Sequence, residues 1–330
     1  MRLERSVTSI SWIPSEAMTG PMRLPMDLGI GHYDDPPPDH LDEGDLEDLR
    51  AADRFRFANN LSAWIEVEDG RIVDTGYSGG GIVGSTTARL GLGSLTFEGV
   101  AYPVMQDPPQ INGPTVRFVQ TAGGRTGSPL PHRSNRPPYL RITAPTAWTT
   151  LALTIGADAS AAFELVGASP FPRHWIYDSD GRLAAKSGLI DFAEWTHVHD
   201  HERSPWHDVQ REAIVAAVES EVERALSREV MGSRPKLRKL GVGDPLTEQG
   251  EPGGDIYLVL DGMLEVDVDG EIVAEVGPGA IVGERAAVEH GVRTSTLRAT
   301  TPVRVAAISA QALAEQDLTD VARGHHREDD

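Results

Sequence analysis

The sequence predicts a mainly β protein with an N-terminal β-sandwich or barrel-like domain, a linking α-helix and a C-terminal β-roll of the jelly-roll type. Short apolar runs separated by glycine and proline fill most of the chain, and one long stretch has helical spacing. All six tryptophans and all seven phenylalanines precede residue 207, which marks a domain boundary. We therefore divide the chain into residues 1–205, a helical linker at 206–232, a roll at 233–317 and a polar tail at 318–330.

The N-terminal domain is predicted from short strands and tight turns. Residues 61–73 and 174–185 are typical of β-hairpins, because each centres on an Asp-Gly pair, at Asp69-Gly70 and Asp180-Gly181. Several short strands with glycine- and proline-rich breaks favour a sandwich or a barrel. The further strands expected between the two hairpins cover residues 102–105, 116–120, 139–143 and 149–155.

A single long helix is predicted over residues 206–232. Apolar side chains recur there at helical spacing, Ser204-Pro205 precedes them as a start signal, and Gly232 followed by Pro235 ends them. The residues that carry this spacing are Val209, Ile214, Val215, Val218, Val222 and Leu226.

The C-terminal third reads as a small antiparallel β-roll. Its apolar runs alternate with turn glycines, and Asp269-Gly270 closes a hairpin after the clearest alternation, at 263–268. The expected strands cover residues 237–240, 256–260, 263–268, 272–276, 294–299 and 303–308.

Composition excludes several functional classes. The net charge of −20 opposes binding to nucleic acid and to anionic membranes, since affinity for phosphate backbones comes mainly from Lys and Arg. With no cysteine, the chain has neither disulfides nor thiolate chemistry. Neither a signal peptide nor an apolar run of the roughly 18 residues that a transmembrane helix needs is present, so we expect a cytoplasmic protein.

Residues from about 234 to 317 resemble the cyclic-nucleotide-binding domain family. The resemblance rests on six segments that follow one another in the family's order. Three come early: Gly243-Asp244, GluGlnGlyGluProGlyGlyAsp (248–255) and TyrLeuValLeuAspGly (257–262). Three follow: GlyProGlyAla (277–280), GlyGluArgAlaAla (283–287) and ArgThrSerThrLeuArgAla (293–299). Motifs spread over the whole segment make it more specific than one short pattern. In that family the stretch from Gly283 to about Thr296 corresponds to the phosphate-binding cassette.

The resemblance implies a site for cAMP or cGMP, with no other cofactor. Arg293 offers a fixed fork of donors to the cyclic phosphate, backbone N–H groups after Glu284 and near Thr294 complete an anion site, and Glu284 accepts from the ribose 2′-hydroxyl. The residues expected to bind the ligand are Gly283, Glu284, Arg285, Ala286, Arg293, Thr294 and Ser295.

We expect a cyclic-nucleotide sensor that relays the state of its ligand to the N-terminal domain, to a protein partner or within a homo-oligomer. The family's transcription factors continue into a DNA-binding helix-turn-helix, and only 22 residues follow Ile308 here. Two alternatives remain: a hydrolase in the N-terminal domain gated by the roll, and an assembly protein with a vestigial site. Residues 1–205 resemble only the N-terminal parts of bacterial proteins with the same two-part build, which implies no chemistry.

Two weaker patterns bear on the hydrolase alternative. Gly76-Tyr77-Ser78-Gly79-Gly80 matches G-x-S-x-G, but a nucleophile elbow needs a strand, a turn and then a helix, and the residues that follow are poor helix formers. Overlapping glycine patterns at 79–84 match a dinucleotide fingerprint and a P-loop without its lysine, and neither opens a predicted helix. We interpret the stretch as a glycine-rich turn.

A histidine cluster is the best candidate for a metal site. Imidazoles two residues apart on a strand project to one side, and neutral histidine binds zinc well. The cluster of His197, His199 and His201 is one residue short of the metallo-hydrolase pattern that it resembles. A polar approach to the linking helix is the favoured interpretation, so no metal is assigned.

Overall fold

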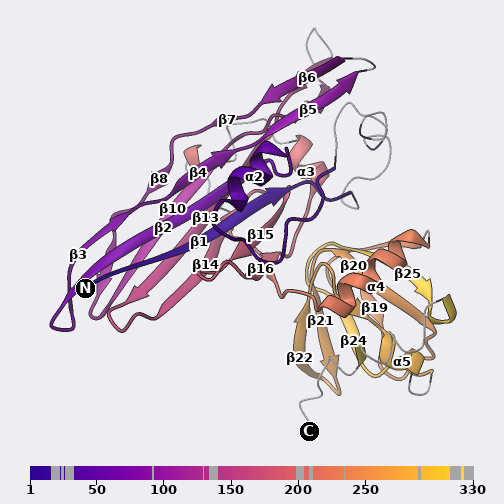
Figure 1. Ribbon diagram of the computed structural model, residues 1–330. Coiled ribbons are helices and arrows are strands. Elements are labelled where there is room, and N and C mark those ends of the chain that lie inside the picture. The colour runs from indigo at the N-terminus through magenta and orange to yellow at the C-terminus, as the bar shows by residue number, and fades with distance from the viewer. Residues whose placement is uncertain are drawn as a thin grey trace. The chain divides into compact units, whose positions relative to one another are not determined.

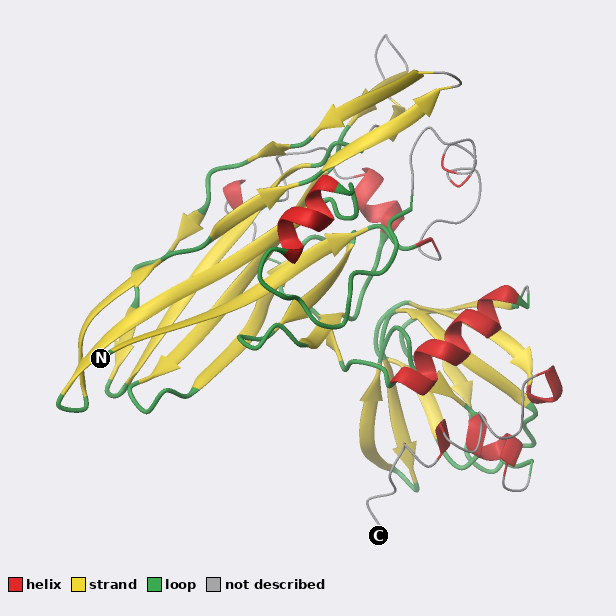
Figure 2. Cartoon of the chain, in the orientation of Figure 1, coloured by secondary structure: helices red, strands yellow, loops and turns green. Residues whose placement is uncertain are grey.

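The computed structural model forms two compact units, Met1–Ala213 and Ile214–Asp330. Strands are the main secondary structure of each unit, and short helices accompany them (Figure 1, Figure 2). The prediction of a mainly β protein is therefore confirmed. The structure describes residues 1–15, 23, 26, 33–90, 93–128, 130–133, 140–197, 204–207, 211–233, 235–288, 291–312 and 321–322.

The N-terminal unit is a sandwich of two antiparallel sheets. The first runs in the order β16 (Leu183–Ser187), β15 (Arg173–Tyr177), β1 (Arg2–Trp12), β2 (Phe57–Glu68) and β3 (Arg71–Tyr77), with β4 (Gly80–Val83) also beside β2. The second runs in the order β14 (Ala161–Ala168), β13 (Thr146–Gly156), β10 (Thr115–Arg125) and β7 (Val100–Ala101), with β8 (Met105–Gln106) and β9 (Gln110–Asn112) also along β10.

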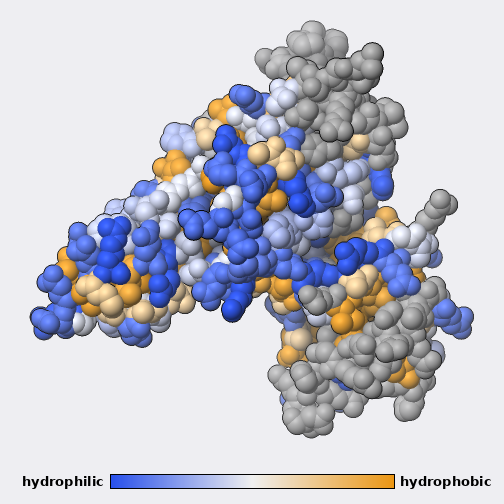
Figure 3. Space-filling model, in the orientation of Figure 1, coloured by the Kyte–Doolittle hydropathy of each residue, from blue (hydrophilic) through white to orange (hydrophobic). Residues whose placement is uncertain are grey.

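The remaining elements of this unit are short. They are the hairpins β5 (Ser85–Leu90) with β6 (Gly93–Glu98) and β11 (Leu130–Arg133) with β12 (Leu140–Thr143), the helices α2 (Asp45–Ala51) and α3 (Phe192–His197), and the 3₁₀ turn η3 (Pro205–His207). Hydrophilic residues cover the visible face around α2, whose first turn is acidic (Figure 3).

Apolar side chains from both sheets meet inside the sandwich. Leu61, Ile65 and Val7 from the first sheet pack against Phe118 and Leu153 from the second, all of them buried. In β2 the core positions are two residues apart, at Leu61, Ala63, Ile65 and Val67, because alternate side chains of a strand point to the same face. Both predicted hairpins are present, as β2–β3 and β15–β16. At Asp69 and Gly70 both φ angles are positive, as a type I′ turn requires.

The C-terminal unit is a roll of two four-stranded antiparallel sheets. One has the order β18 (Lys236–Leu240), β25 (Val303–Ser309), β20 (Asp255–Asp261) and β23 (Ile281–Val282). The other has the order β19 (Pro245–Thr247), β24 (Thr296–Ala299), β21 (Leu264–Val268) and β22 (Glu271–Val276). The helices are α4 (Glu221–Gly232) and α5 (Glu284–Val288), with β17 (Val215–Ala216) before them and the 3₁₀ turn η4 (Ala310–Ala312) after β25.

Strand β20 shows how the roll is filled. Ile256 and Leu258 join the cluster under α4, whereas Tyr257 and Val259 join the cluster between the two sheets. Because side chains alternate between the faces of a strand, a continuous apolar run is buried on both sides. The strands expected at 237–240, 256–260, 263–268, 272–276 and 303–308 are confirmed within one residue at each end, and 294–299 is confirmed from Thr296 onward.

The predicted helix over 206–232 is wrong in its first half. Helix α4 begins at Glu221, because Ser220 and Glu223 form a capping box: the Ser220 hydroxyl accepts from the Glu223 N–H, and the Glu223 carboxylate accepts from the Ser220 N–H. Upstream, Ala213 donates its N–H to Val166 O at 3.2 Å, so its backbone pairs with a strand edge. The helical spacing of apolar residues gave a wrong prediction before Glu221, because backbone pairing with a strand outweighed it there.

The strand expected at 102–105 is wrong for residues 102–104, because β7 ends at Ala101 and β8 begins only at Met105. Pro103 has no N–H to donate, so the pairing with β10 is interrupted after Tyr102, whose N–H still donates to Gly123 O at 2.9 Å. No helix in the part of the chain that the structure describes is long and apolar enough to cross a bilayer.

Candidate functional site

A tight turn between β23 and α5 begins the candidate site. Gly283 has a φ of +87°, a left-handed conformation that side chains rarely adopt. A Cβ at this position would stand 2.6 Å from Nη1 of Arg293 and 3.1 Å from the Asp255 carbonyl. Glycine is therefore required here both for the turn and for the close approach of the arginine.

Arg293 lies buried against this turn with 7% of its surface exposed. Its Nη1 donates a hydrogen bond of 3.2 Å to the Gly283 carbonyl, and its guanidinium carbon is 5.3 Å from the centroid of the Tyr257 ring. An arginine carries five N–H donors in a fixed fork. Within the described residues the Arg293 guanidinium makes this one hydrogen bond, which leaves N–H donors for an anion.

The loop at residues 248–254 holds the backbone of Arg293. The Arg293 N–H donates to Glu251 O at 2.8 Å, and its carbonyl accepts from the Gly250 N–H at 2.9 Å. A Cβ on Gly253 would lie 2.1 Å from Nε of Arg293, so the side chain passes directly over this glycine. The GluGlnGlyGluProGlyGlyAsp segment, one of the motifs of the resemblance, thus supports both the backbone and the side chain of Arg293.

Of the predicted site residues, Gly283 and Arg293 are in direct contact, and the others flank these two in the sequence. Glu284 and Ala286 are buried in α5, and the Ala286 carbonyl accepts from the Gly291 N–H at 2.7 Å, which folds the chain back toward Arg293. Thr294 and Ser295 are half-buried just before β24. Arg285 lies apart from this group, because its Nη2 donates to the Ala322 carbonyl at 3.4 Å.

The G-x-S-x-G segment does not form a nucleophile elbow. Gly76 and Tyr77 end β3 and Gly80 begins β4, so the turn joins two strands and no helix follows. The Ser78 hydroxyl is exposed and donates to a carboxylate oxygen of Glu4 at 2.6 Å. The glycine patterns at 79–84 run from the residue before β4 to the residue after it, and they likewise open no helix.

The histidine candidates receive no support as a metal site. His197 is the last residue of α3, so it lies on a helix and not on the strand that the spacing required. His199 and His201 lie outside the described residues. Among the residues that the structure describes, no three His, Asp or Glu side chains come together as metal ligands do.

Sequence reasoning missed a buried serine and histidine pair. Ser11 in β1 and His174 in β15 are fully buried, with Ser11 Oγ 2.8 Å from Nδ1. His174 Nε2 is 2.9 Å from the Ser169 carbonyl, which can only accept, so Nε2 carries the proton and Nδ1 accepts from Ser11. Burial lowers the pKa of His174 to about 4. Without access for a substrate, the neutral pair serves structure.

Comparison with known proteins identifies the roll. Residues 237–317 match the family model described as "Cyclic nucleotide-binding domain". A search of curated proteins found no match.

Several solved structures each match about a third of the chain. The N-terminal domain of a transcriptional regulator from Streptomyces coelicolor A3(2) is 28% identical, covers 33% of this chain and 74% of its own, with a TM-score of 0.23. A cyclic nucleotide-binding domain from Methylobacillus flagellatus KT is 27% identical, covers 32% and 60%, with a TM-score of 0.24. A cyclic nucleotide-binding-like protein from Brucella abortus is 20% identical, covers 31% and 99%, with a TM-score of 0.25. Residues 237–317 belong to the cyclic nucleotide-binding domain family.

Proposed function

We propose that the protein is a regulator whose C-terminal roll binds cAMP or cGMP through Gly283, Glu284, Arg293 and neighbouring residues. One observation carries the proposal: a buried arginine in a matched cyclic nucleotide-binding domain keeps most of its donors unused within the described residues. Burying a cation is costly unless it is paired, and a cyclic phosphate supplies the matching anion. The cyclic phosphate therefore supplies the anion that the buried Arg293 guanidinium requires.

Calorimetric titration with cAMP and cGMP tests the site. We expect saturable binding to the wild type and a loss of about 30- to 1000-fold in Arg293→Ala, since a buried charged hydrogen bond is removed. Arg298→Ala is the matched control, because Arg298 is an exposed arginine on β24. Its affinity should stay within about threefold of wild type. Absence of heat from the wild type at millimolar ligand contradicts the proposal.

Glu284 is proposed to accept from the ribose 2′-hydroxyl. A 2′-deoxy cyclic nucleotide lacks that donor, so it should bind the wild type about tenfold more weakly than its parent. Glu284→Ala should bind both ligands equally. A wild type that binds the two ligands equally well would remove this role from Glu284.

We propose that the state of the ligand is relayed from the nucleotide site to helix α4. Glu223 is buried at the first turn of α4, and its Oε1 accepts from the Ile281 N–H at 3.2 Å, two residues before Gly283. Leu226 and Val230 of α4 pack in the same cluster as Ile281, with Ala287 of α5 against it. A shift of the cassette therefore has a direct path to the helix that leads back to the N-terminal unit.

Hydrogen exchange of residues 221–232 with and without cAMP tests the relay. We expect the ligand to change exchange in the wild type and in Glu229→Ala, an exposed control on the same helix. In Glu223→Ala the ligand should still bind, but the exchange of α4 should become independent of it. An unchanged response in Glu223→Ala would place the relay elsewhere.

A further inference from the structure

Tyr257 has an unusual position for the sole large aromatic residue of its unit. No other Trp, Tyr or Phe follows Trp206 in the sequence. Tyr257 lies in the middle of β20 with 5% of its surface exposed, in the cluster between the two sheets of the roll. Its ring is therefore fixed inside the roll, next to the candidate site.

Two guanidinium groups lie against this one ring. The guanidinium carbon of Arg293 is 5.3 Å from the ring centroid, and that of Arg238, from β18, is 5.6 Å away. Arg238 lies toward the hydroxyl, because its Nη1 is 3.4 Å from the Tyr257 oxygen. At the other end, a Cβ on Gly283 would be 3.5 Å from Cδ2 of the ring. The ring thus spans the distance between Arg238 and the Gly283 turn.

The ring supplies a restraint that hydrogen bonding does not. Within the described residues the Arg293 guanidinium has one hydrogen bond, of 3.2 Å, to Gly283. A single bond leaves the planar group free to rotate about it, whereas attraction to the face of an aromatic ring restricts its position. Such attraction strengthens when the cation is desolvated, and Arg293 is buried.

We propose that Tyr257 is the positioning residue that holds the Arg293 guanidinium ready for the cyclic phosphate before the ligand arrives. The inference rests on the proposed function and adds a mechanism of preorganisation to it. In this proposal the Tyr257 ring lies near the phosphate of the ligand and does not contact its base. Substitutions at Tyr257 should therefore change the affinities for cAMP and cGMP by the same factor, because the ring acts through the arginine and not through the base.

Affinity measurements on two variants separate the ring from its hydroxyl. Tyr257→Leu removes the ring and should weaken binding of both cAMP and cGMP about 5- to 30-fold. Tyr257→Phe keeps the ring, loses only the hydroxyl that accepts from Arg238, and should bind within about threefold of wild type. Equal losses in both variants would assign the effect to the hydroxyl and overturn the proposal.

Fluorinated phenylalanines incorporated at position 257 distinguish attraction from packing. Each added fluorine withdraws charge from the ring face while size changes little, so affinity should fall stepwise from Tyr257→Phe to the most fluorinated ring. A double-mutant cycle of Tyr257→Leu with Arg293→Lys should also show a coupling of about fivefold or more. Affinity independent of fluorination, with additive losses in the cycle, would show a merely structural role.

A measurement without ligand separates this inference from the proposed function. The Nε–H resonance of Arg293, assigned by its disappearance in Arg293→Lys, should be shifted by the Tyr257 ring current in wild type and in Tyr257→Phe. It should move to an ordinary position in Tyr257→Leu. If the resonance is ordinary in the wild type, the positioning role is wrong whatever binds; if it is shifted while no cyclic nucleotide binds, only the proposed ligand is wrong.

Discussion

The two units each bury an arginine, and they satisfy it in opposite ways. Arg56 in the N-terminal unit is 1% exposed; it pairs with Asp34 through Nη2 at 2.8 Å and Nε at 3.2 Å, and donates to Asp53 O at 2.8 Å. It also contacts the Ser85 carbonyl and the Thr86 hydroxyl. The guanidinium of Arg293 in the C-terminal unit has one hydrogen bond within the described residues. We call a buried charged group saturated when protein groups take up its hydrogen-bonding capacity, and unsaturated when they do not. A saturated group stabilises the fold, whereas an unsaturated one is available to a ligand.

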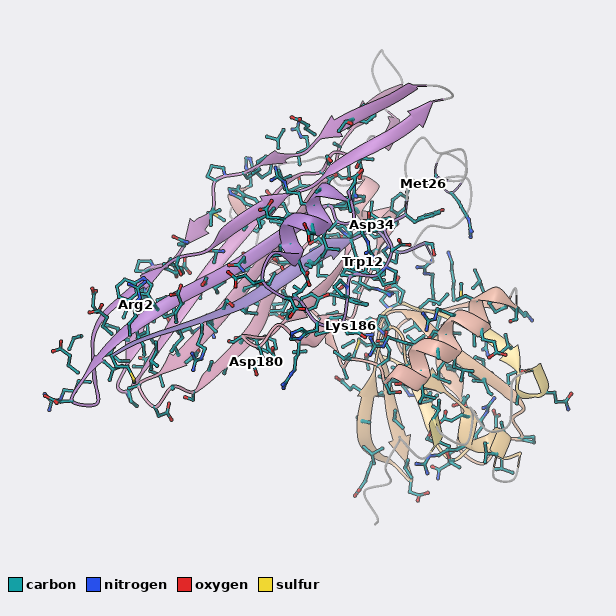
Figure 4. The ribbon with its side chains drawn as sticks, viewed as in Figure 1. Arg2, Trp12, Met26, Asp34, Asp180 and Lys186 are labelled. Atoms are coloured by element: carbon teal, nitrogen blue, oxygen red, sulfur yellow. The ribbon has the colours of Figure 1, made fainter. Side chains whose placement is uncertain are left out.

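The surroundings of Asp34 show why the N-terminal arrangement is structural. Its Oδ2 also accepts from the Ile13 N–H at 2.7 Å, so one carboxylate joins the end of β1 to the residue before β2. Figure 4 shows Asp34 close to Trp12, at the end of β1 opposite Arg2. Every oxygen of this carboxylate is committed to the protein, so no ligand is needed to neutralise the group.

The largest expected change in stability comes from breaking the buried pair of Arg56 and Asp34. Arg56→Met leaves Asp34 buried without its cation and should lower the free energy of unfolding of the N-terminal unit by about 3–5 kcal/mol. Arg293→Met should lower that of the C-terminal unit by less than about 2 kcal/mol. Urea unfolding measures both. The exposed pair of Arg117 and Glu164 gives the control Arg117→Met, which should cost less than about 1 kcal/mol. Equal losses from the two buried arginines would remove the distinction.

The next effect comes from His174, a second saturated group of the N-terminal unit. Its pKa is about 4 in the fold and 6.5 in the unfolded chain, so the unfolded chain takes up the proton first as the pH falls. The stabilisation is complete above pH 6.5 and is lost as the pH falls through about 4. Between pH 7.5 and 4.5 the loss should be about 2–3 kcal/mol.

Urea midpoints at the two pH values measure this loss. His174→Gln should remove that part of the pH dependence. His40→Gln, at a half-exposed histidine, should retain it. A wild type and a His174→Gln variant with the same pH dependence would show that His174 is not the titrating group.

A smaller effect sharpens the description of the unsaturated arginine. Gly253→Ala puts a methyl group where Arg293 lies, and the flexible side chain can move aside, so affinity for the cyclic nucleotide should fall about tenfold with little loss of stability. Gly254→Ala is the matched control, because its Cβ would meet nothing within 4 Å. Calorimetry and thermal unfolding measure the two quantities. Similar affinities in the two variants would mean that Arg293 does not contact the ligand.

The smallest expected effect concerns the start of α4. Ser220→Ala removes the capping hydroxyl and should cost the C-terminal unit about 1 kcal/mol. Ser227→Ala, inside the same helix, should change stability by less than about 0.5 kcal/mol. Thermal unfolding of the two variants checks the difference, and a neutral Ser220→Ala would show that the capping box does not set the beginning of the helix.

The sequence by itself determined the local features. Asp-Gly pairs closed the hairpins at residues 69–70, 180–181 and 269–270, and alternation of apolar residues predicted the strands of the roll. The motifs from Gly243 to Ala299 were sufficient to identify a cyclic nucleotide-binding domain, which the family model confirms. These features depend on residues close to one another in the chain, so a single sequence reveals them.

Only the tertiary structure decided which distant residues meet. The strand at Arg2–Trp12 and the pairing of Ser11 with His174, 163 residues away, had no local signal. The helix predicted from residue 206 shortened because backbone pairing and a capping box replaced its first half. Arg56 looks like an ordinary residue in the sequence, and the motif that identified Arg293 gave no sign that Tyr257 lies against it. Burial and the partners that the fold brings to them decide whether a charge is saturated or left for a ligand.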